Sequence, residues 1–116
     1  MAESAIQKKS FDFALSIIAL CRQMQSECEW VLSRQLLKSG TSIGANWEEA
    51  EAAQSRADFL SKMSIASKKA RETRYWLRLL HASELTTLNV QTELSQVEEI
   101  VRLLTAIVKT TSQSPN

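Results

Sequence analysis

The stretch of chain that decides the fold runs from Arg34 to Ala50 and reads R-Q-L-L-K-S-G-T-S-I-G-A-N-W-E-E-A. It places both glycines of the protein, Gly40 and Gly44, inside an apolar pattern of helical period. Each glycine weakens a helix by about 1 kcal/mol relative to alanine. Small residues four apart also let two helix backbones approach closely. We therefore expect a second helix to pack closely against Gly40 and Gly44.

The composition of the whole chain agrees with a helical fold. Its 116 residues are 44% hydrophobic, which fits one compact domain over residues 1–116. Two glycines and one proline leave little material for hairpin turns, while helix-forming residue types dominate. The composition therefore predicts an all-α protein.

The N-terminal sequence M-A-E-S-A-I-Q-K-K-S contains no apolar signal core. The longest apolar run, Phe11 to Cys21, is interrupted by Asp12 and is too short to span a bilayer. We therefore expect a cytoplasmic protein with no membrane partner.

The chain has two cysteines, Cys21 and Cys28, and this number excludes a multi-bridge disulfide framework and a four-cysteine zinc site. Free cysteine behaves as a small hydrophobic residue. Both are expected to be buried thiols.

Apolar periodicity predicts four helices, over residues 10–25, 29–53, 56–83 and 91–111. The first apolar stripe includes Ile17 and Ile18, and the second includes Leu36, Ile43 and Trp47. Ser55, with an acidic residue three positions later, resembles a capping box at the start of the third helix. Short links between long amphipathic helices favour an antiparallel up-down-up-down four-helix bundle.

Positive charge is concentrated in the third predicted helix. Seven basic and two acidic residues lie between Ser55 and Ser83, a net charge of +5 in a chain whose net charge is +1. Arg71, Arg74 and Arg78 fall on one side of this helix. Arginine binds phosphate in a bidentate fashion, so this stripe is a candidate nucleic-acid contact. The alternative is a solvated face, or ion pairs with acids of the second helix, namely Glu48, Glu49 and Glu51.

The third helix also has apolar residues away from its core-facing side, at Ile65, Trp76 and Leu79. A second apolar side fits either a broadly buried helix or a subunit interface. Trp76 and its neighbour Tyr75 favour the interface, because aromatic residues are enriched in such contacts. We expect self-association through Ile65, Tyr75, Trp76 and Leu79.

No catalytic centre is recognisable in the sequence. His81 is the only histidine, and Arg78 stands where a di-iron bundle would need glutamate. A serine nucleophile would also need a histidine base and an acid around it. We expect no enzymatic activity, no metal site and no cofactor, with His81 in a structural role.

Two strings of the sequence are specific to a known family. They are Q-L-L-K-S-G-T-S-I-G-A-N from Gln35, followed by E-E-A, and D-F-L-S-K-M-S-I-A-S-K-K-A-R-E-T-R-Y-W-L-R-L-L from Asp58. The chain resembles the four-helix-bundle proteins encoded by intervening sequences of bacterial 23S ribosomal RNA genes. The resemblance extends from about Phe11 to Val108.

This resemblance implies a homopentameric ring and no established enzymatic activity. It also implies kinship with the accessory proteins of diversity-generating retroelements, which bind a reverse transcriptase and nucleic acid. Carried over to this chain, the basic surface of those relatives falls on Lys68, Lys69, Arg71, Arg74 and Arg78. Trp47 replaces a smaller aliphatic residue of the family, so we expect either a repacked core or a contact with a neighbouring subunit.

The sequence thus predicts an oligomeric protein that binds or scaffolds nucleic acid, in particular RNA, through the basic face of its third helix. The alternative is a protein-interaction scaffold whose arginines are paired or solvated and have no nucleic-acid role.

Overall fold

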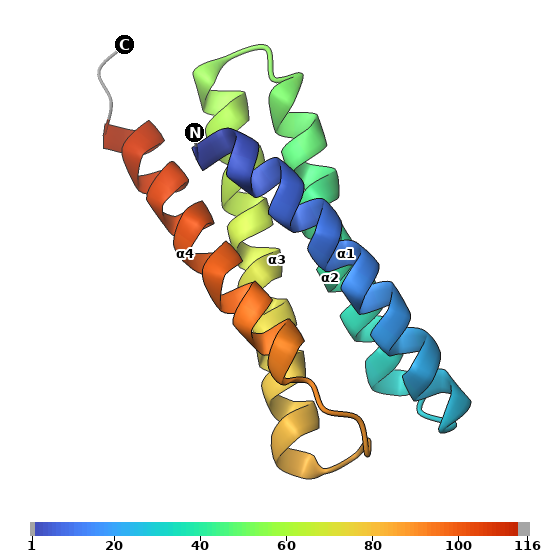
Figure 1. Ribbon diagram of the computed structural model, residues 1–116. Coiled ribbons are helices and arrows are strands. Elements are labelled where there is room, and N and C mark those ends of the chain that lie inside the picture. Colours follow the sequence, from blue (N-terminus) through green and yellow to red (C-terminus); the bar gives the residue numbers. More distant parts are fainter. Residues whose placement is uncertain (1, 114–116) are drawn as a thin grey trace.

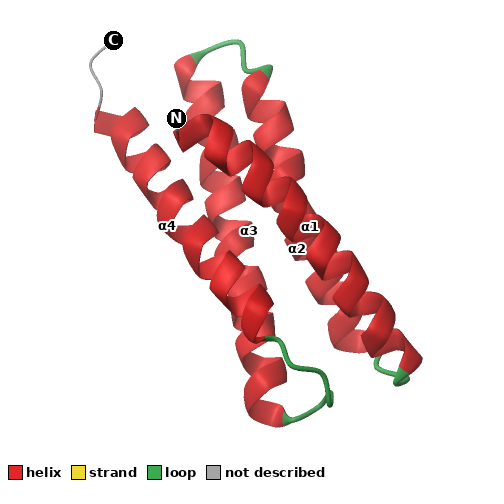
Figure 2. Ribbon diagram, viewed as in Figure 1, coloured by secondary structure: helices red, strands yellow, loops and turns green. Residues whose placement is uncertain are grey.

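The protein is all-α, with four helices connected by short loops (Figures 1 and 2). A computed structural model describes the backbone of residues 2–113 and the side chains of residues 5–113. The helices are α1 (Ala2–Ser26), α2 (Val31–Glu51), α3 (Arg56–Ser83) and α4 (Gln91–Gln113). All regular structure within residues 2–113 is helical.

The observed bounds of α3 match the predicted range, whereas α1 begins at Ala2 and the predicted start was about residue 10. Ile6 explains the longer helix, because it lies seven residues before Phe13 and both side chains are fully buried. Helix α2 is slightly shorter than predicted, and α4 extends two residues further, to Gln113. Ser55 caps α3 as expected, with its hydroxyl oxygen accepting a hydrogen bond from the Asp58 amide at 3.0 Å.

The helices pack side by side in an elongated molecule of 50 × 21 × 20 Å. Each helix contacts two others: α1 packs against α2 and α4, and α3 packs against the same two helices. The loops lie at alternate ends of the molecule, with the α2–α3 loop at one end and the other two loops at the opposite end (Figure 2).

One apolar core fills the space between the helices. Leu36 and Ile43 of α2, Met63 and Leu77 of α3, and Leu104 of α4 are all completely buried. Trp47 is only 4% exposed and belongs to this core, so its side chain packs inside the bundle.

The two glycines of α2 lie against α1. A Cβ atom on Gly40 would lie 3.0 Å from Cγ2 of Ile17, and one on Gly44 would lie 3.4 Å from the hydroxyl of Ser10. Since 3.0 Å is shorter than ordinary van der Waals contact, Gly40 lets the α2 backbone lie closer to Ile17 than any other residue would allow.

The prediction that both cysteines are buried is wrong for Cys28. Cys21 is buried, donates to the carbonyl oxygen of Ser33 at 3.3 Å, and has its pKa raised to about 11 by burial. Cys28 is exposed because it lies in the turn after α1, where its φ angle is +66°. This left-handed residue closes a Schellman motif, in which the Glu29 amide donates to the Met24 carbonyl at 2.9 Å.

Candidate nucleic-acid interface

The basic residues of α3 lie along both edges of the helix. On the edge beside α2, Lys62 forms an ion pair with Glu49 at 2.7 Å, which raises the pKa of Lys62. On the edge beside α4, Arg71 donates to the Thr105 hydroxyl at 3.0 Å. Arg74 lies 3.6 Å from Glu98 on the same edge. Two of the three arginines of the stripe, Arg71 and Arg74, therefore lie at the contact between α3 and α4.

The alternative prediction, that the acids of α2 neutralise this stripe, holds only for Lys62 and Glu49. The arginines contact α4 instead, because residues 71 and 74 lie on the α4 edge of the helix. Within the described residues, Glu48 and Glu51 form no ion pair, and Lys69 pairs inside its own helix with Glu72 at 3.5 Å.

Several cations on this side of the molecule keep their charge unneutralised. Within residues 5–113, no carboxylate pairs with Lys68 or Arg78 of α3, nor with Arg102 or Lys109 of α4. All four are exposed. These cations therefore remain available to a phosphate.

Arg102 is a candidate contact that the sequence interpretation missed. It lies four residues after Glu98 and three before Thr105, the partners of Arg74 and Arg71, so it shares the α3–α4 edge. With Glu98, Leu94 and two polar neighbours, Arg102 lines a shallow hollow of about 450 Å³. The sequence feature that could have identified Arg102 is its spacing from Glu98 and Thr105. This spacing places Arg102 beside α3 only once α3 is known to pack against α4.

The residues predicted to form a subunit interface divide into two groups. Tyr75 and Ile65 are exposed, whereas Trp76 and Leu79 are half-buried. The Trp76 ring packs against the core, and its Nε1 donates to Glu72 at 3.1 Å. Tyr75 stands edge-to-face against Trp76, with 5.3 Å between ring centroids.

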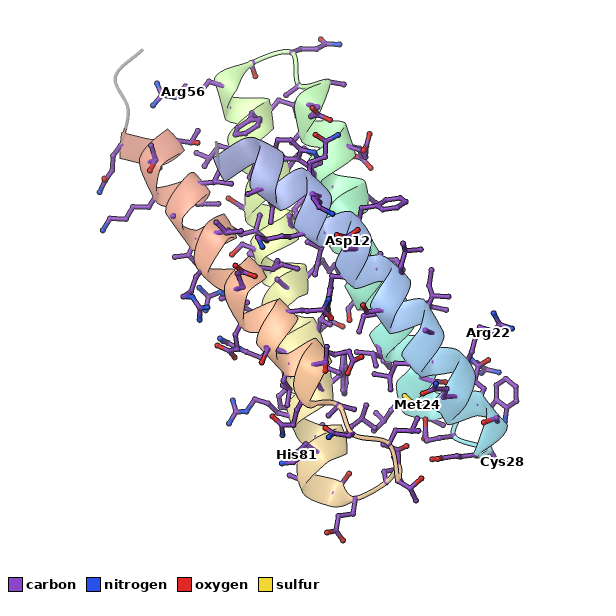
Figure 3. The ribbon with its side chains drawn as sticks, in the orientation of Figure 1. Asp12, Arg22, Met24, Cys28, Arg56 and His81 are labelled. Atoms are coloured by element: carbon purple, nitrogen blue, oxygen red, sulfur yellow. The ribbon has the colours of Figure 1, made fainter. Side chains whose placement is uncertain are left out.

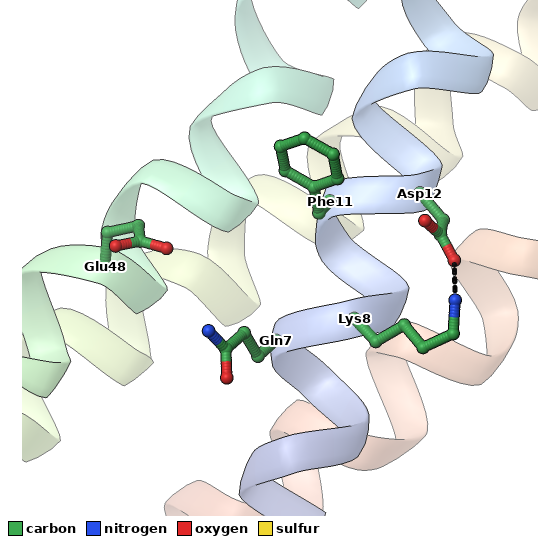
Figure 4. Close-up of a pocket in the computed structure, with 5 residues that line it drawn as sticks. All are labelled: Gln7, Lys8, Phe11, Asp12 and Glu48. Atoms are coloured by element: carbon green, nitrogen blue, oxygen red, sulfur yellow. Dashed lines mark hydrogen bonds and ion pairs between the residues drawn. The ribbon is translucent and has the colours of Figure 1, made fainter.

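A larger apolar surface lies on α1 and was also missed. Phe11, Leu15 and Ile18 are 65%, 53% and 40% exposed, and their spacing places them on one side of the helix. Ile18, a member of the apolar stripe predicted for the first helix, therefore lies outside the buried core. Figure 4 shows Phe11 beside a hollow of about 310 Å³ that includes Asp12 and Glu48.

The remaining chemistry-bearing residues are dispersed. His81 is exposed near the end of α3, where the side-chain nitrogen of Gln91 lies 3.4 Å from its ring nitrogens (Figure 3). Among the described residues, no three His, Cys, Asp or Glu side chains gather in a group that could hold a metal ion. None of the helices, over the same residues, is long and apolar enough to cross a membrane.

Comparison with known proteins identifies a solved structure and a protein family that are similar to this chain. A crystal structure of a protein of unknown function from the S23 ribosomal protein family of Bacteroides thetaiotaomicron superposes with a TM-score of 0.89. It is 46% identical in sequence, and the match covers 95% of this chain and 100% of that one. A search of curated proteins found no match. Residues 2–106 match the family described as 23S rRNA-intervening sequence protein, and the chain belongs to that family.

Proposed function

We propose that this protein is a non-enzymatic, oligomeric scaffold that binds nucleic acid through the basic face of α3. The face consists of Lys68, Lys69, Arg71, Arg74 and Arg78. The observation that carries the proposal is that Lys68 and Arg78 are exposed with no carboxylate partner within the described residues, in a helix whose net charge is +5. The family's name refers to 23S rRNA, which favours RNA as the ligand.

We also propose an antiparallel up-down-up-down bundle that assembles into a ring, which the family resemblance suggests is pentameric. Loops at alternate ends of the molecule support the topology (Figure 2). Exposed apolar side chains on opposite helices, Ile65 of α3 and Phe11 and Leu15 of α1, support the assembly, because patches of this kind mark contacts. Sedimentation of the purified protein tests it, and a monomer at all concentrations would refute the ring.

The nucleic-acid proposal is tested by titrating a labelled RNA at several salt concentrations. The affinity should fall linearly in log salt, because binding releases counterions from the phosphates. A variant carrying Arg71→Ala, Arg74→Ala and Arg78→Ala should bind more weakly and lower the slope by about 0.7 to 0.9 for each phosphate that the variant no longer neutralises.

A matched control is a variant with Arg22→Ala, Arg34→Ala and Lys38→Ala. It removes the same charge from exposed residues of α1 and α2 that have no ion pair among the described residues. It should keep most of the affinity if the site is on α3. Absence of RNA and DNA binding by the unaltered protein at low salt would refute the proposal.

The second candidate function is a protein-interaction scaffold without a nucleic-acid role. The apolar surface of α1, formed by Phe11, Leu15 and Ile18, favours it. A reverse transcriptase is the partner type that the resemblance to retroelement accessory proteins suggests. Replacing Phe11 and Leu15 by serine should abolish such an interaction and leave the arginines of α3 intact.

A further inference from the structure

The exposed ring of Tyr75 lies among the arginines of α3. Tyr75 follows Arg71 by four positions and precedes Arg78 by three, so at about 100° per residue it lies within about 60° of both on the helix surface. Trp76, by contrast, turns toward the core. An aromatic ring that is 55% exposed therefore stands between two cations that have no carboxylate partner within the described residues.

The ring of Tyr75 is held in place by its neighbours. It makes an edge-to-face contact with Trp76 at an interplanar angle of 62°. The Trp76 indole is fixed in turn by its hydrogen bond to Glu72, and Lys69 pairs with the other oxygen of the same carboxylate. A ring fixed in this way loses little conformational entropy when a second flat group stacks on it.

Cations come from the facing helix as well. Arg102 of α4 lies on the edge where Arg71 contacts Thr105, and within the described residues it forms no ion pair. The α3–α4 surface thus combines cations from both helices with one exposed aromatic ring. Positive grooves with aromatic platforms bind single strands, because an unpaired base can stack while the backbone follows the charges.

We infer that the α3–α4 surface takes single-stranded nucleic acid, with phosphates on Arg71, Arg78 and Arg102 and one base stacked on Tyr75. This inference rests on the proposed function and deepens it, since the arginines alone do not distinguish a single strand from a duplex. It also moves Tyr75 from the predicted subunit interface to the ligand surface.

The experiment compares a labelled oligouridine with an RNA hairpin of the same length, and an oligothymidine tests whether the 2′-hydroxyl matters. The single strand should bind at least about 5-fold more tightly than the hairpin, because paired bases cannot stack on Tyr75. Tyr75→Ala should weaken binding of the single strand by about 5- to 150-fold, whereas Tyr75→Phe, which keeps the ring, should change it less than about 2-fold. Arg102→Ala should lower the salt slope by about 0.7, and Arg22→Ala, on the distant end of α1 (Figure 3), should leave it unchanged.

The outcomes separate this inference from the function on which it rests. Equal binding of hairpin and single strand, with no effect of Tyr75→Ala, would overturn the inference and leave nucleic-acid binding in place. A lower sedimentation mass for Tyr75→Ala would return Tyr75 to the subunit interface and also overturn it. Absence of binding to every probe by the unaltered protein would refute the proposed function itself.

Discussion

The contact between α1 and α2 differs from the contact between α3 and α4 in the kinds of residue that form it. In the first, Gly40 lies against the branched side chain of Ile17, where an added Cβ atom would come within 3.0 Å of Cγ2, and Ser10 and Ser33 are buried. In the second, long side chains reach across an exposed edge, where Arg71 contacts Thr105 and Arg74 contacts Glu98.

This difference separates the residues that determine folding from those available for binding. A close steric contact tolerates little added volume, because protein interiors are packed at the density of organic crystals. Exposed polar contacts contribute little to stability, so the residues that make them are free to serve a ligand. The α1–α2 contact therefore constrains the fold, and the α3–α4 edge holds the exposed side chains on which the proposed function depends.

The largest expected effect comes from Gly40→Leu. The added side chain would overlap Ile17, and we expect the free energy of unfolding to fall by about 3 kcal/mol, or folding to fail. Urea denaturation followed by circular dichroism measures the change. Arg71→Ala, the matched change at the α3–α4 edge, should cost less than about 1 kcal/mol. Equal destabilisation by the two substitutions would refute the contrast between these helix pairs.

Substitution of Gly44 sharpens the same comparison. A Cβ atom there would lie at 3.4 Å from the Ser10 hydroxyl, the limit of ordinary contact. Gly44→Ala should therefore stabilise the protein by up to about 1 kcal/mol through helix propensity, while Gly40→Ala should stabilise it less because Ile17 must move. Greater stabilisation by Gly40→Ala than by Gly44→Ala would show that Ile17 and α1 move away from the added Cβ atom at little energetic cost.

A smaller effect is expected at the ends of α1 and α3, one in each helix pair. Cys28 and Glu84 occupy left-handed backbone conformations, with φ angles of +66° and +57°. Glycine adopts this conformation without the steric penalty, although it also increases the entropy of the unfolded chain. Cys28→Gly and Glu84→Gly should each stabilise the protein by about 0.5–1 kcal/mol, measured by urea denaturation. Destabilisation by either would mean that the native side chain makes a compensating contact.

The sequence predicted the helices well where an apolar stripe is dense and poorly where it is sparse. The bounds of α3 follow from its capping box and its buried residues at helical spacing. The start of α1 was missed because Ile6 stands alone among polar and small residues, and only its distance from Phe13 connects it to the core. The exposure of Cys28 was missed because it depends on the geometry of the turn after α1, which the residue type does not indicate.

The sequence indicated which residues of α3 belong to the candidate site, but it did not indicate which neighbouring helix they contact. Periodicity placed Arg71, Arg74 and Arg78 on one side of α3, and in the structure Arg71 and Arg74 contact α4. A helical wheel gives the direction of a side chain but does not say which helix lies there. The candidacy of Arg102 and the pairing of Arg74 with Glu98 could therefore be recognised only from the packing order of the four helices.

The smallest expected effect concerns the link between the two helix pairs. Glu27, after α1, accepts hydrogen bonds from the Thr87 and Thr86 hydroxyls of the α3–α4 loop at 2.6 and 2.7 Å, and these bonds lower the pKa of Glu27 from its ordinary value of 4.5. A lowered pKa in the folded state means that the carboxylate stabilises the fold above about pH 4.5 and loses this contribution as the pH falls through the folded pKa.

Glu27→Gln should therefore be less stable than the unaltered protein at pH 7, by a small margin that shrinks as the pH falls below 4.5. Thr87→Val, which removes the hydroxyl that lowers this pKa most, should bring the pKa of Glu27 closer to 4.5, as followed by NMR titration of its carboxyl carbon. A stability difference between Glu27→Gln and the unaltered protein that stays constant with pH would show that the carboxylate charge does not hold the two helix pairs together. The α1–α2 and α3–α4 pairs would then be joined through the apolar core and the contacts of α2 with α3 and of α1 with α4.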